Sequence, residues 1–411
     1  MRALVAVLTL LASVTAGCSD GVDAPPDSET VAGSLTIAAA GGEGEIKALN
    51  DLVAAFRAAY PDVDATLDTV ESASDLVTKV TTSFAGGNPP DVFLMNYRRL
   101  GGFTTQIDPV TGVDTAQLYP ATTAAFTRDG KLLCLPQNAS SLVVYLNPAL
   151  FADAGVALPS PDWTWADMLT TARALAVQKV EAVGFDPLLI RVAPFVWSAG
   201  GEIVDAVDTP ARIDLASPEA RTALQLLLDL QRTGLDATER AGMNPEDTFA
   251  AGKLAMYLDS RRAVPGFRKT EGLEFDVRPI PTGAKGRISV LHSDGYCVTK
   301  AAKNKSAARA FAAYAIGAEG GRVLAESGRT VPSVRSLAES DAFLAPEKPP
   351  ASSRAWLDQL PELRALPLHR HWNGAEGTAD DILTQLFAGR IGVDEAIEEI
   401  AALTEVEFAK S

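Results

Sequence analysis

The stretch Gly86-Gly87-Asn88-Pro89-Pro90-Asp91-Val92-Phe93-Leu94-Met95 joins a run of chain-breaking residues directly to a short apolar run. Gly, Asn and Pro punctuate a chain at loops, whereas residues 91–95 have the pattern of a buried strand. Upstream, the same alternation occurs twice, with strands predicted at 35–39 and 63–67 and helices at 46–56 and 76–84. Strands that alternate with helices indicate βαβ units around a mostly parallel sheet.

Downstream of this stretch the chain becomes richer in helix. Short strands are predicted at 254–258 and 275–279. Apolar residues three and four apart predict helices at 165–177, 219–233, 244–251, 307–315, 320–326, 382–387 and 393–408. No repeat of fixed period occurs, which disfavours solenoids and propellers. The expected class is therefore α/β.

Length and charge limit the functions that the chain can have. At roughly 150 residues per domain, 411 residues suggest two or three domains. The net charge of −16 argues against a nucleic-acid partner, because phosphate binding needs clustered Lys and Arg. The same charge argues against a basic surface that holds the body of the protein on anionic lipid.

The N-terminus reads as an export signal. Arg2 precedes an apolar run, 3–14, that is too short to span a bilayer, and Thr15-Ala16-Gly17-Cys18 follows. This resembles a bacterial lipobox, which predicts a signal peptide at 1–17 and lipidation of Cys18; the alternative is a secretory signal with an incidental cysteine. Residues 18–34 are polar and predict a flexible tether. We therefore expect an exported protein, anchored by lipid to a membrane at the periplasmic or extracellular face.

Several further segments, in the same order, resemble the family 1 extracellular solute-binding proteins, the group that includes the maltose-binding proteins. The breaker and strand at 86–92 match the family's signature before its third strand. The other matching segments are Gly130-Lys131-Leu132-Leu133-Cys134-Leu135-Pro136, 142–155, Trp163-Thr164-Trp165-Ala166-Asp167-Met168, Trp197-Ser198-Ala199-Gly200-Gly201, 249–256, Pro279-Ile280-Pro281, 304–311 and Gly328-Arg329-Thr330-Val331-Pro332. Their order over nearly the whole chain from Leu35 carries the resemblance.

The resemblance implies a two-lobed periplasmic-binding-protein type II fold, in which each lobe is a mostly parallel sheet flanked by helices and hinge strands join the lobes. The N-lobe would comprise 35–135 plus 298–333, and the C-lobe 136–297 plus 334–411, with hinges near 135–140 and 294–298. Cys134 and Cys297 fall in the expected hinge-crossing strands, so a disulfide across the hinge is implied. The alternative is two buried thiols.

In such a protein the ligand contacts lie in loops that face the cleft. Transferring the family pattern gives the candidates Gly41, Glu43, Glu45, Glu71, Asn96, Tyr97, Asn138, Ser140, Trp197, Asp259, Arg261, His292, Asp294 and Trp372. Aromatic rings would cover the apolar faces of a sugar, while carboxylates and amides would bind its hydroxyls. The alternatives are core tryptophans and, for the glutamates, solvated acids at helix starts.

One segment departs from the family. Where many relatives carry a tryptophan after the strand at 254–258, this chain has Asp259-Ser260-Arg261-Arg262. Arginine forks suit carboxylate or phosphate groups, so an acidic or phosphorylated solute is an alternative to a sugar. The other interpretation is that these arginines pair with acids of this acidic chain.

Rival functions have weaker support. The chain has no Gly-x-Ser-x-Gly elbow, His-Glu-x-x-His motif or P-loop, and Lys47 stands where a dinucleotide fingerprint needs glycine. The spacing of the three histidines does not indicate a metal site, and no cofactor is expected. We expect a non-enzymatic binding protein for a small solute, monomeric, that serves the transmembrane subunits of an ABC permease. A sensor that presents its closed form to a membrane receptor remains an alternative, and a glycoside hydrolase is the least favoured.

Overall fold

In the computed structural model, which describes residues 31–233 and 244–410, the predicted N-terminal strands form one sheet. Its strand order is β2–β1–β3–β12–β6. The strands are β1 (Gly33–Ala40), β2 (Val63–Val70), β3 (Val92–Asn96), β6 (Leu135–Pro136) and β12 (Asp294–Val298). β1 is parallel to both β2 and β3, while β12 is antiparallel to β3 and β6. Cys18, the leader and residues 18–30 lie outside the described residues.

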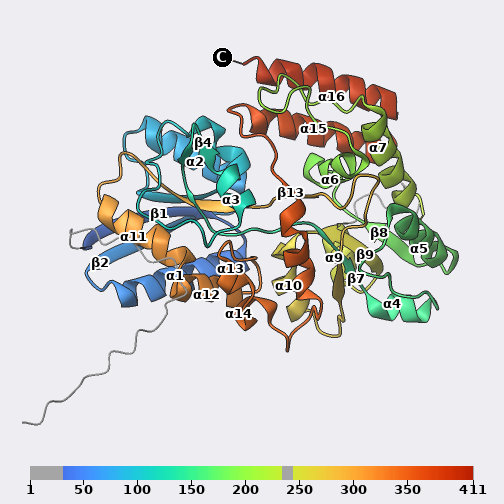
Figure 1. The fold of residues 1–411 in the computed structure, drawn as a ribbon, viewed down its shortest axis with the longest axis horizontal. Helices are drawn as coiled ribbons and strands as arrows, with labels where there is room; N and C mark the ends of the chain where they lie inside the picture. The colour runs from blue at the N-terminus through green and yellow to red at the C-terminus, as the bar shows by residue number, and fades with distance from the viewer. Residues whose placement is uncertain (1–30, 234–243, 411) are drawn as a thin grey trace, which may run out of the picture.

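Four main helices complete the N-lobe (Figure 1). They are α1 (Glu43–Ala59), α2 (Ala73–Ala85), α11 (Lys305–Ile316) and α12 (Ala318–Glu326). The first three contact this sheet, and the fourth, α12, packs on α1 and α11. The apolar stripe of α1 is buried, and its Phe56 meets Phe311 of α11 edge to face at 5.2 Å between centroids. The breaker before β3 has a structural role. Buried Asp91 accepts hydrogen bonds from the backbone and hydroxyl of Thr36 and from the Lys303 backbone, which ties three segments together.

The second sheet belongs to the C-lobe and has the order β10–β7–β9–β8. Its strands are β7 (Val143–Leu146), β8 (Glu181–Gly184), β9 (Leu254–Asp259) and β10 (Asp276–Pro279). Only β8 and β9 run parallel; β7 is antiparallel to both β9 and β10. The expectation of a mostly parallel sheet is therefore wrong for this lobe. Fully buried strands read as continuous apolar runs, so their pattern carries no information on direction.

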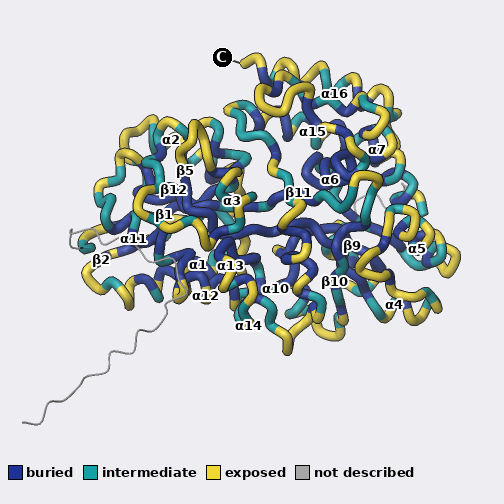
Figure 2. Tube along the Cα trace, in the orientation of Figure 1, coloured by how far each residue is buried: buried dark blue, intermediate teal, exposed yellow. Residues whose placement is uncertain are grey.

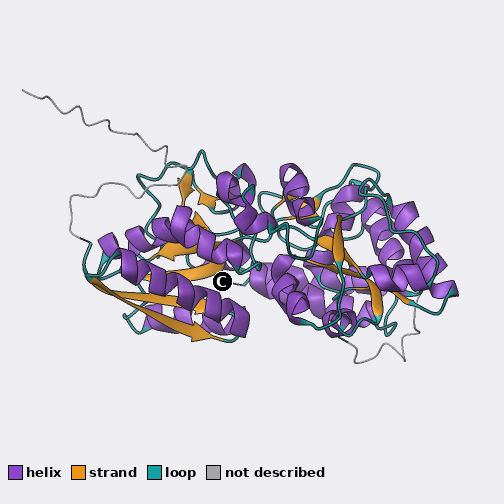
Figure 3. Ribbon diagram, turned by 90° about the horizontal axis from the view of Figure 1, so that it is seen from below, coloured by secondary structure: helices purple, strands orange, loops and turns teal. Residues whose placement is uncertain are grey.

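Helices surround the second sheet, and a helical pair ends the chain (Figures 1 and 3). The long ones are α5 (Trp165–Val177), α6 (Leu189–Ala199), α7 (Pro218–Gln231), α15 (Trp372–Phe387) and α16 (Val393–Phe408). The start of α5 is set by a capping box between Thr164 and Asp167. α15 packs on α16 and on α6, so the C-terminal pair belongs to the C-lobe.

Short elements complete the fold. They are η1 (Tyr97–Gly102), α3 (Pro120–Ala125), β4 (Thr127–Arg128), β5 (Lys131–Leu132), α4 (Pro148–Asp153), α9 (Pro245–Ala250), η2 (Arg261–Ala263), α10 (Val264–Lys269), β11 (Ser289–Val290), α13 (Arg335–Ala338), α14 (Asp341–Leu344), η3 (Ser353–Glu362) and β13 (Leu363–Arg364). Within the described ranges, no helix has the length and apolarity needed to cross a bilayer.

Three crossing segments connect the lobes and lie side by side. Residues 137–142 form the first crossing and 291–293 the second; 327–352, between α12 and η3, form the third. The first is flanked by the other two, because Ser140 pairs with His292 and Asn138 with Pro332. The first crossing and β9 are buried along their whole length, whereas the third crossing is exposed at 335–336 and 346–349 (Figure 2). The lobe boundaries remain a proposal. The second hinge, expected near 294–298, is placed at 291–293, because 294–298 form β12, which pairs along its whole length with β3 of the N-lobe.

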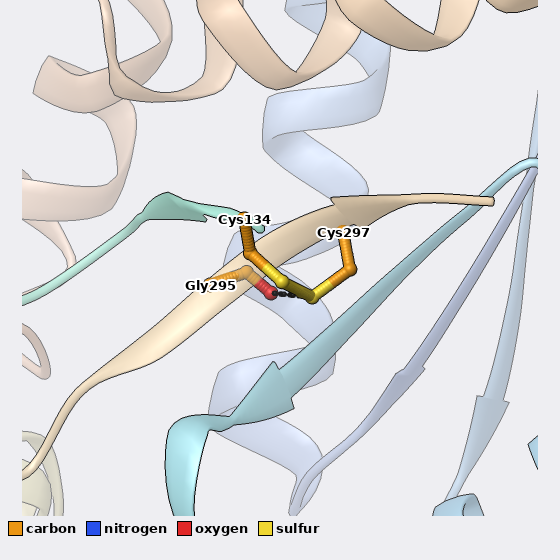
Figure 4. The surroundings of a disulfide bond; sticks show 3 residues. All are labelled: Cys134, Gly295 and Cys297. Atoms are coloured by element: carbon orange, nitrogen blue, oxygen red, sulfur yellow. Dashed lines mark hydrogen bonds between the residues drawn. A yellow bond between two sulfur atoms is a disulfide. The ribbon is translucent and has the colours of Figure 1, made fainter. Parts of the chain in front are cut away.

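A disulfide joins Cys134 to Cys297, with 4.4 Å between the Cα atoms (Figure 4). Cys134 directly precedes β6 and Cys297 lies in β12, which are antiparallel neighbours in the five-stranded sheet. The bridge therefore lies within the N-lobe, where two crossings enter it, rather than across the hinge as the resemblance implied.

Candidate functional site

Polar side chains gather where the lobes meet, around the first and second crossings. Asn96 ends β3 and faces Asp294 in the β3–β12 register. The Asn96 amide donates to one carboxylate oxygen of Asp294 at 3.2 Å, and the Asn138 amide donates to the other at 3.1 Å. The Asp294 backbone donates in turn to Asn138 Oδ1 at 2.9 Å. Three of the candidates from the sequence are therefore brought together in one hydrogen-bonded cluster.

Ser140 and His292 form the next pair along the crossings. Their backbones exchange two hydrogen bonds, of 2.9 and 2.8 Å. Ser140 Oγ and His292 Nε2 are both buried and have no hydrogen-bond partner within the described part of the chain. Burial lowers the pKa of His292 well below its ordinary value, and Arg191 and Arg98 add to this effect. The imidazole is therefore neutral at physiological pH, and Ser140 Oγ and His292 Nε2 are two hydrogen-bonding atoms beside the crossings that no described residue satisfies.

On the C-lobe side, Asp259 at the end of β9 is completely buried and organises two arginines. Its carboxylate pairs with Arg191 of α6 and with Arg262, each at 2.5 Å. Tyr257 donates its hydroxyl to the same carboxylate at 2.6 Å. Burial opposes ionisation, but the two guanidiniums outweigh it and the pKa of Asp259 is lowered. Asp259 thus holds Arg191 and Arg262 rather than binding a guest itself, since its oxygens are occupied.

Two sets of contacts run from lobe to lobe beside this cluster. Arg98 of η1 pairs with Glu376 of α15, and Arg99 donates to Asn373 on the same helix. Gly101 permits this approach, because a Cβ at this position would lie 2.2 Å from the His369 carbonyl oxygen. In this structure the lobes therefore touch directly through η1 and α15.

The second set starts at Glu45 in the first turn of α1. Its carboxylate pairs with Arg329 at 2.6 Å, and Arg329 also reaches the Arg262 carbonyl at 3.5 Å. Burial raises the pKa of Glu45 despite the opposing effect of Arg329. By contrast, Glu43 and Glu71 are exposed, and Gly41 is half-buried at the end of β1. Of the three glutamates predicted from the sequence, only Glu45 takes part in these contacts between the lobes.

The aromatic candidates are not available for stacking in this structure. Tyr97 is completely buried; its hydroxyl donates to the Leu291 carbonyl and accepts from the Leu366 backbone. Trp197 is 2% exposed, and the Arg364 guanidinium lies 4.7 Å from its ring centroid. Trp372 is completely buried because it begins α15 rather than lying in a polar loop. The stacking roles predicted for these rings are therefore corrected to structural ones.

Arg261 also departs from its expected role. It is completely buried and lies between the rings of Phe343 and Trp356, 4.2 and 4.7 Å from their centroids. Its hydrogen bonds go to the Gly328 and Phe343 carbonyls. The fork predicted to bind an anionic solute is thus occupied by protein groups, because its nitrogens donate to carbonyls of the third crossing.

Several charged residues near the junction of the lobes were missed by sequence reasoning: Arg98, Arg99, Arg191, Arg329, Glu376 and Asp380. Arg262 pairs with Asp259 and Glu246, which agrees with the interpretation that it pairs with acids of this chain. The sequence did indicate a special role for Arg191, because it is the one charged residue of the mainly apolar helix Leu189–Ala199. It also indicated one for Asp380 and Glu376, which lie one turn apart on α15. Burial, followed by the charge of Glu376, raises the pKa of Asp380 to about 7.

One cavity, of about 370 Å³, is lined from both lobes. Its walls are Arg128, Val207, Asp208, Thr209, Pro210, Pro367, Leu368 and His369. The wall mixes apolar and charged groups, which suits the outer part of a polar guest. Among the described residues, no group of three or more His, Cys, Asp or Glu side chains is placed to hold a metal ion.

Comparisons with known proteins agree with this architecture. The model of one family, described as bacterial extracellular solute-binding protein, matches residues 40–322, well over half of the chain. A binding protein of Brucella abortus is 22% identical over 372 residues, covering 87% of this chain and 88% of that protein. The diacetylchitobiose binding protein DasA of Streptomyces coelicolor is 24% identical over 360 residues, covering 83% and 81%.

A solved structure has the same fold. The ABC substrate-binding protein of Listeria monocytogenes in complex with cycloalternan superposes with a TM-score of 0.82 at 22% identity, covering 92% of this chain and 100% of that one. At this identity the likeness bears on the fold alone, which is the two-lobed α/β fold that the sequence predicted.

Proposed function

This chain belongs to the bacterial extracellular solute-binding proteins, and on that premise we propose that it captures a neutral sugar or oligosaccharide between its lobes for an ABC importer. The proposal includes export, processing before Cys18 and lipid anchoring through that residue. The transmembrane permease subunits would be its protein partners, and the protein would act as a monomer without catalysing a reaction.

The observation that carries the proposal is that four arginines near the junction of the lobes are already paired with carboxylates of this chain. They are Arg98, Arg191, Arg262 and Arg329. An anionic guest at one of these four arginines would have to displace its carboxylate, which is costly in a partly buried site. The unpartnered Ser140 Oγ and His292 Nε2 instead match hydroxyl groups, which donate and accept without charge.

The named relatives support a saccharide. DasA of Streptomyces coelicolor binds diacetylchitobiose, and the Listeria protein was solved with cycloalternan. The cavity at Arg128 and His369 would extend the site toward longer saccharides. An acidic or phosphorylated solute is the second candidate, favoured by Arg99, which donates to the Asn373 amide rather than to a carboxylate.

We infer a mechanism in which the solute meets one lobe while the cleft is open, and the second lobe completes its hydrogen bonds on closure. The direct contacts of η1 with α15 would then be exchanged for contacts through the solute. Closure buries polar groups of the solute, so each must find a partner such as Ser140 or His292.

A thermal-shift screen of the mature protein tests the proposal. The panel comprises neutral mono- and oligosaccharides, sugar phosphates, uronic acids and amino acids. A solute at a hundred times its dissociation constant adds about 2.7 kcal/mol of stability, and we expect this from a neutral saccharide. A shift with sugar phosphates or uronic acids alone would favour the second candidate. No shift with any saccharide or its acidic derivatives would contradict the proposal. Chromatography of the bound saccharide after long incubation should recover it intact.

A further inference from the structure

Arg261 is a buried cation that no carboxylate of the described chain neutralises. Its side chain is completely buried, yet its hydrogen-bond acceptors are two backbone carbonyls and, at 3.5 Å, the Ser353 hydroxyl. Burial lowers its pKa to about 9, so the guanidinium keeps its charge at neutral pH. A buried charge without an ionic partner is expensive, and the faces of Phe343 and Trp356 offset this cost only in part. The location of the hydrogen-bond acceptors of Arg261 indicates what this buried charge does.

The acceptors of Arg261 share one property, because they all lie on the third crossing or at its end. Gly328 lies just after α12 of the N-lobe, and its carbonyl accepts from Nε at 2.9 Å. Phe343 is in the middle of the crossing and accepts from Nη2 at 3.1 Å. Ser353 begins η3, which packs on β10 of the C-lobe. One guanidinium therefore contacts the third crossing where it leaves the N-lobe, midway, and where it reaches the C-lobe.

Arg268, in α10, also contacts the third crossing. Its Nε donates to the Pro349 carbonyl at 2.6 Å. Its guanidinium also lies against Gly328, where a Cβ would come within 2.5 Å of Nη1. Gly328 has a φ of +77°, a conformation that favours glycine. The close approach of two arginines to the start of the crossing thus depends on the glycine that precedes Arg329.

We propose that Arg261 is a positioning residue of the hinge, which fixes the path of the third crossing and thereby limits the angles that the two lobes adopt. Arg261 follows β9 of the C-lobe, whereas Gly328 follows α12 of the N-lobe, so the hydrogen bond between them spans the lobes. Without the Arg261 guanidinium, the Gly328 and Phe343 carbonyls have no hydrogen-bond donor. Water can replace it only if the third crossing moves away from the C-lobe.

The experiment compares Arg261→Met, Arg261→Lys and the matched control Arg354→Lys, an exposed arginine in η3. Hydrogen exchange and small-angle X-ray scattering are recorded on the solute-free mature protein, well below its melting temperature. For Arg261→Met we expect amides of 328–353 to exchange about tenfold faster and the radius of gyration to increase. Arg261→Lys, which keeps the charge but not the fork, should be intermediate, and Arg354→Lys should match the wild type.

Wild-type exchange and scattering in a folded Arg261→Met protein would overturn the proposal. Increased exchange throughout the chain without a change in the radius of gyration would do the same, because that pattern indicates a purely packing role. If Arg261→Met does not fold, Phe343→Leu removes one ring face and is judged by the same two measurements. No solute is needed, so the outcome is independent of the proposed function.

Discussion

Arg98 of η1 and Glu376 of α15 form an ion pair that joins the N-lobe to the C-lobe directly. Their side chains are 14% and 7% exposed, so the pair is largely shielded from solvent. Removing one member of a buried pair leaves the other uncompensated, and the cost exceeds that of losing a surface pair.

We therefore expect Glu376→Gln to lower the free energy of unfolding by about 3 kcal/mol in urea denaturation. The matched control is Asp394→Asn, which breaks the Arg221–Asp394 pair, whose carboxylate is 82% exposed. That change should cost less than about 1 kcal/mol. Equal losses in the two variants would contradict a buried inter-lobe pair.

Ser140→Ala should weaken saccharide binding without weakening the fold. The hydroxyl has no partner in the described chain, so its removal leaves no group of the protein unsatisfied. One lost hydrogen bond to the solute corresponds to about a threefold to tenfold rise in the dissociation constant, measured by calorimetry with the saccharide that gives the largest thermal shift.

The control for this variant is Ser333→Ala. Ser333 is buried and donates to the Pro136 carbonyl, so its loss should lower the melting temperature and leave the affinity near that of the wild type. If both variants behave alike, the assignment of Ser140 to the solute is wrong.

Asp380→Asn should stabilise the protein in a pH-dependent manner. Burial raises the pKa of Asp380 from 3.8 to about 7, so the native state binds this proton more tightly than the unfolded state. Its contribution to the free energy of unfolding is fully present below pH 3.8 and is lost as pH rises through about 7. The asparagine should therefore raise the melting temperature at pH 8 and change it little at pH 4. A gain that is the same at both values would exclude this origin.

Reduction of the Cys134–Cys297 disulfide should destabilise the N-lobe. The bond closes a loop with a sequence separation of 163 residues, and the loss expected for such a native disulfide is about 2–5 kcal/mol. Melting with and without a reductant measures this difference. The Cys134→Ser/Cys297→Ser variant should melt near the reduced wild type and not respond to the reductant.

Much of the fold was predictable because it depends on local pattern. The alternation of apolar runs with chain breakers placed β1, β2 and β3, and helical spacing placed α1, α5 and α16. The direction of β7 was not predictable, since a buried strand reads alike in either direction. For Trp372, a polar neighbourhood in the sequence suggested exposure, whereas its first-turn position on α15 turned it into the core.

The sequence by itself determined the α/β class, the two-lobed family fold and the presence of polar groups at strand ends, because periodicity and order of motifs are properties of the chain alone. Only the tertiary structure decided which of those groups meet. It placed Asn96, Asn138 and Asp294 in one cluster and directed Arg261 into an aromatic cage. It also brought Arg98 to Glu376, 278 residues away along the chain. Such partners are set by how the lobes and crossings pack, which no local pattern encodes.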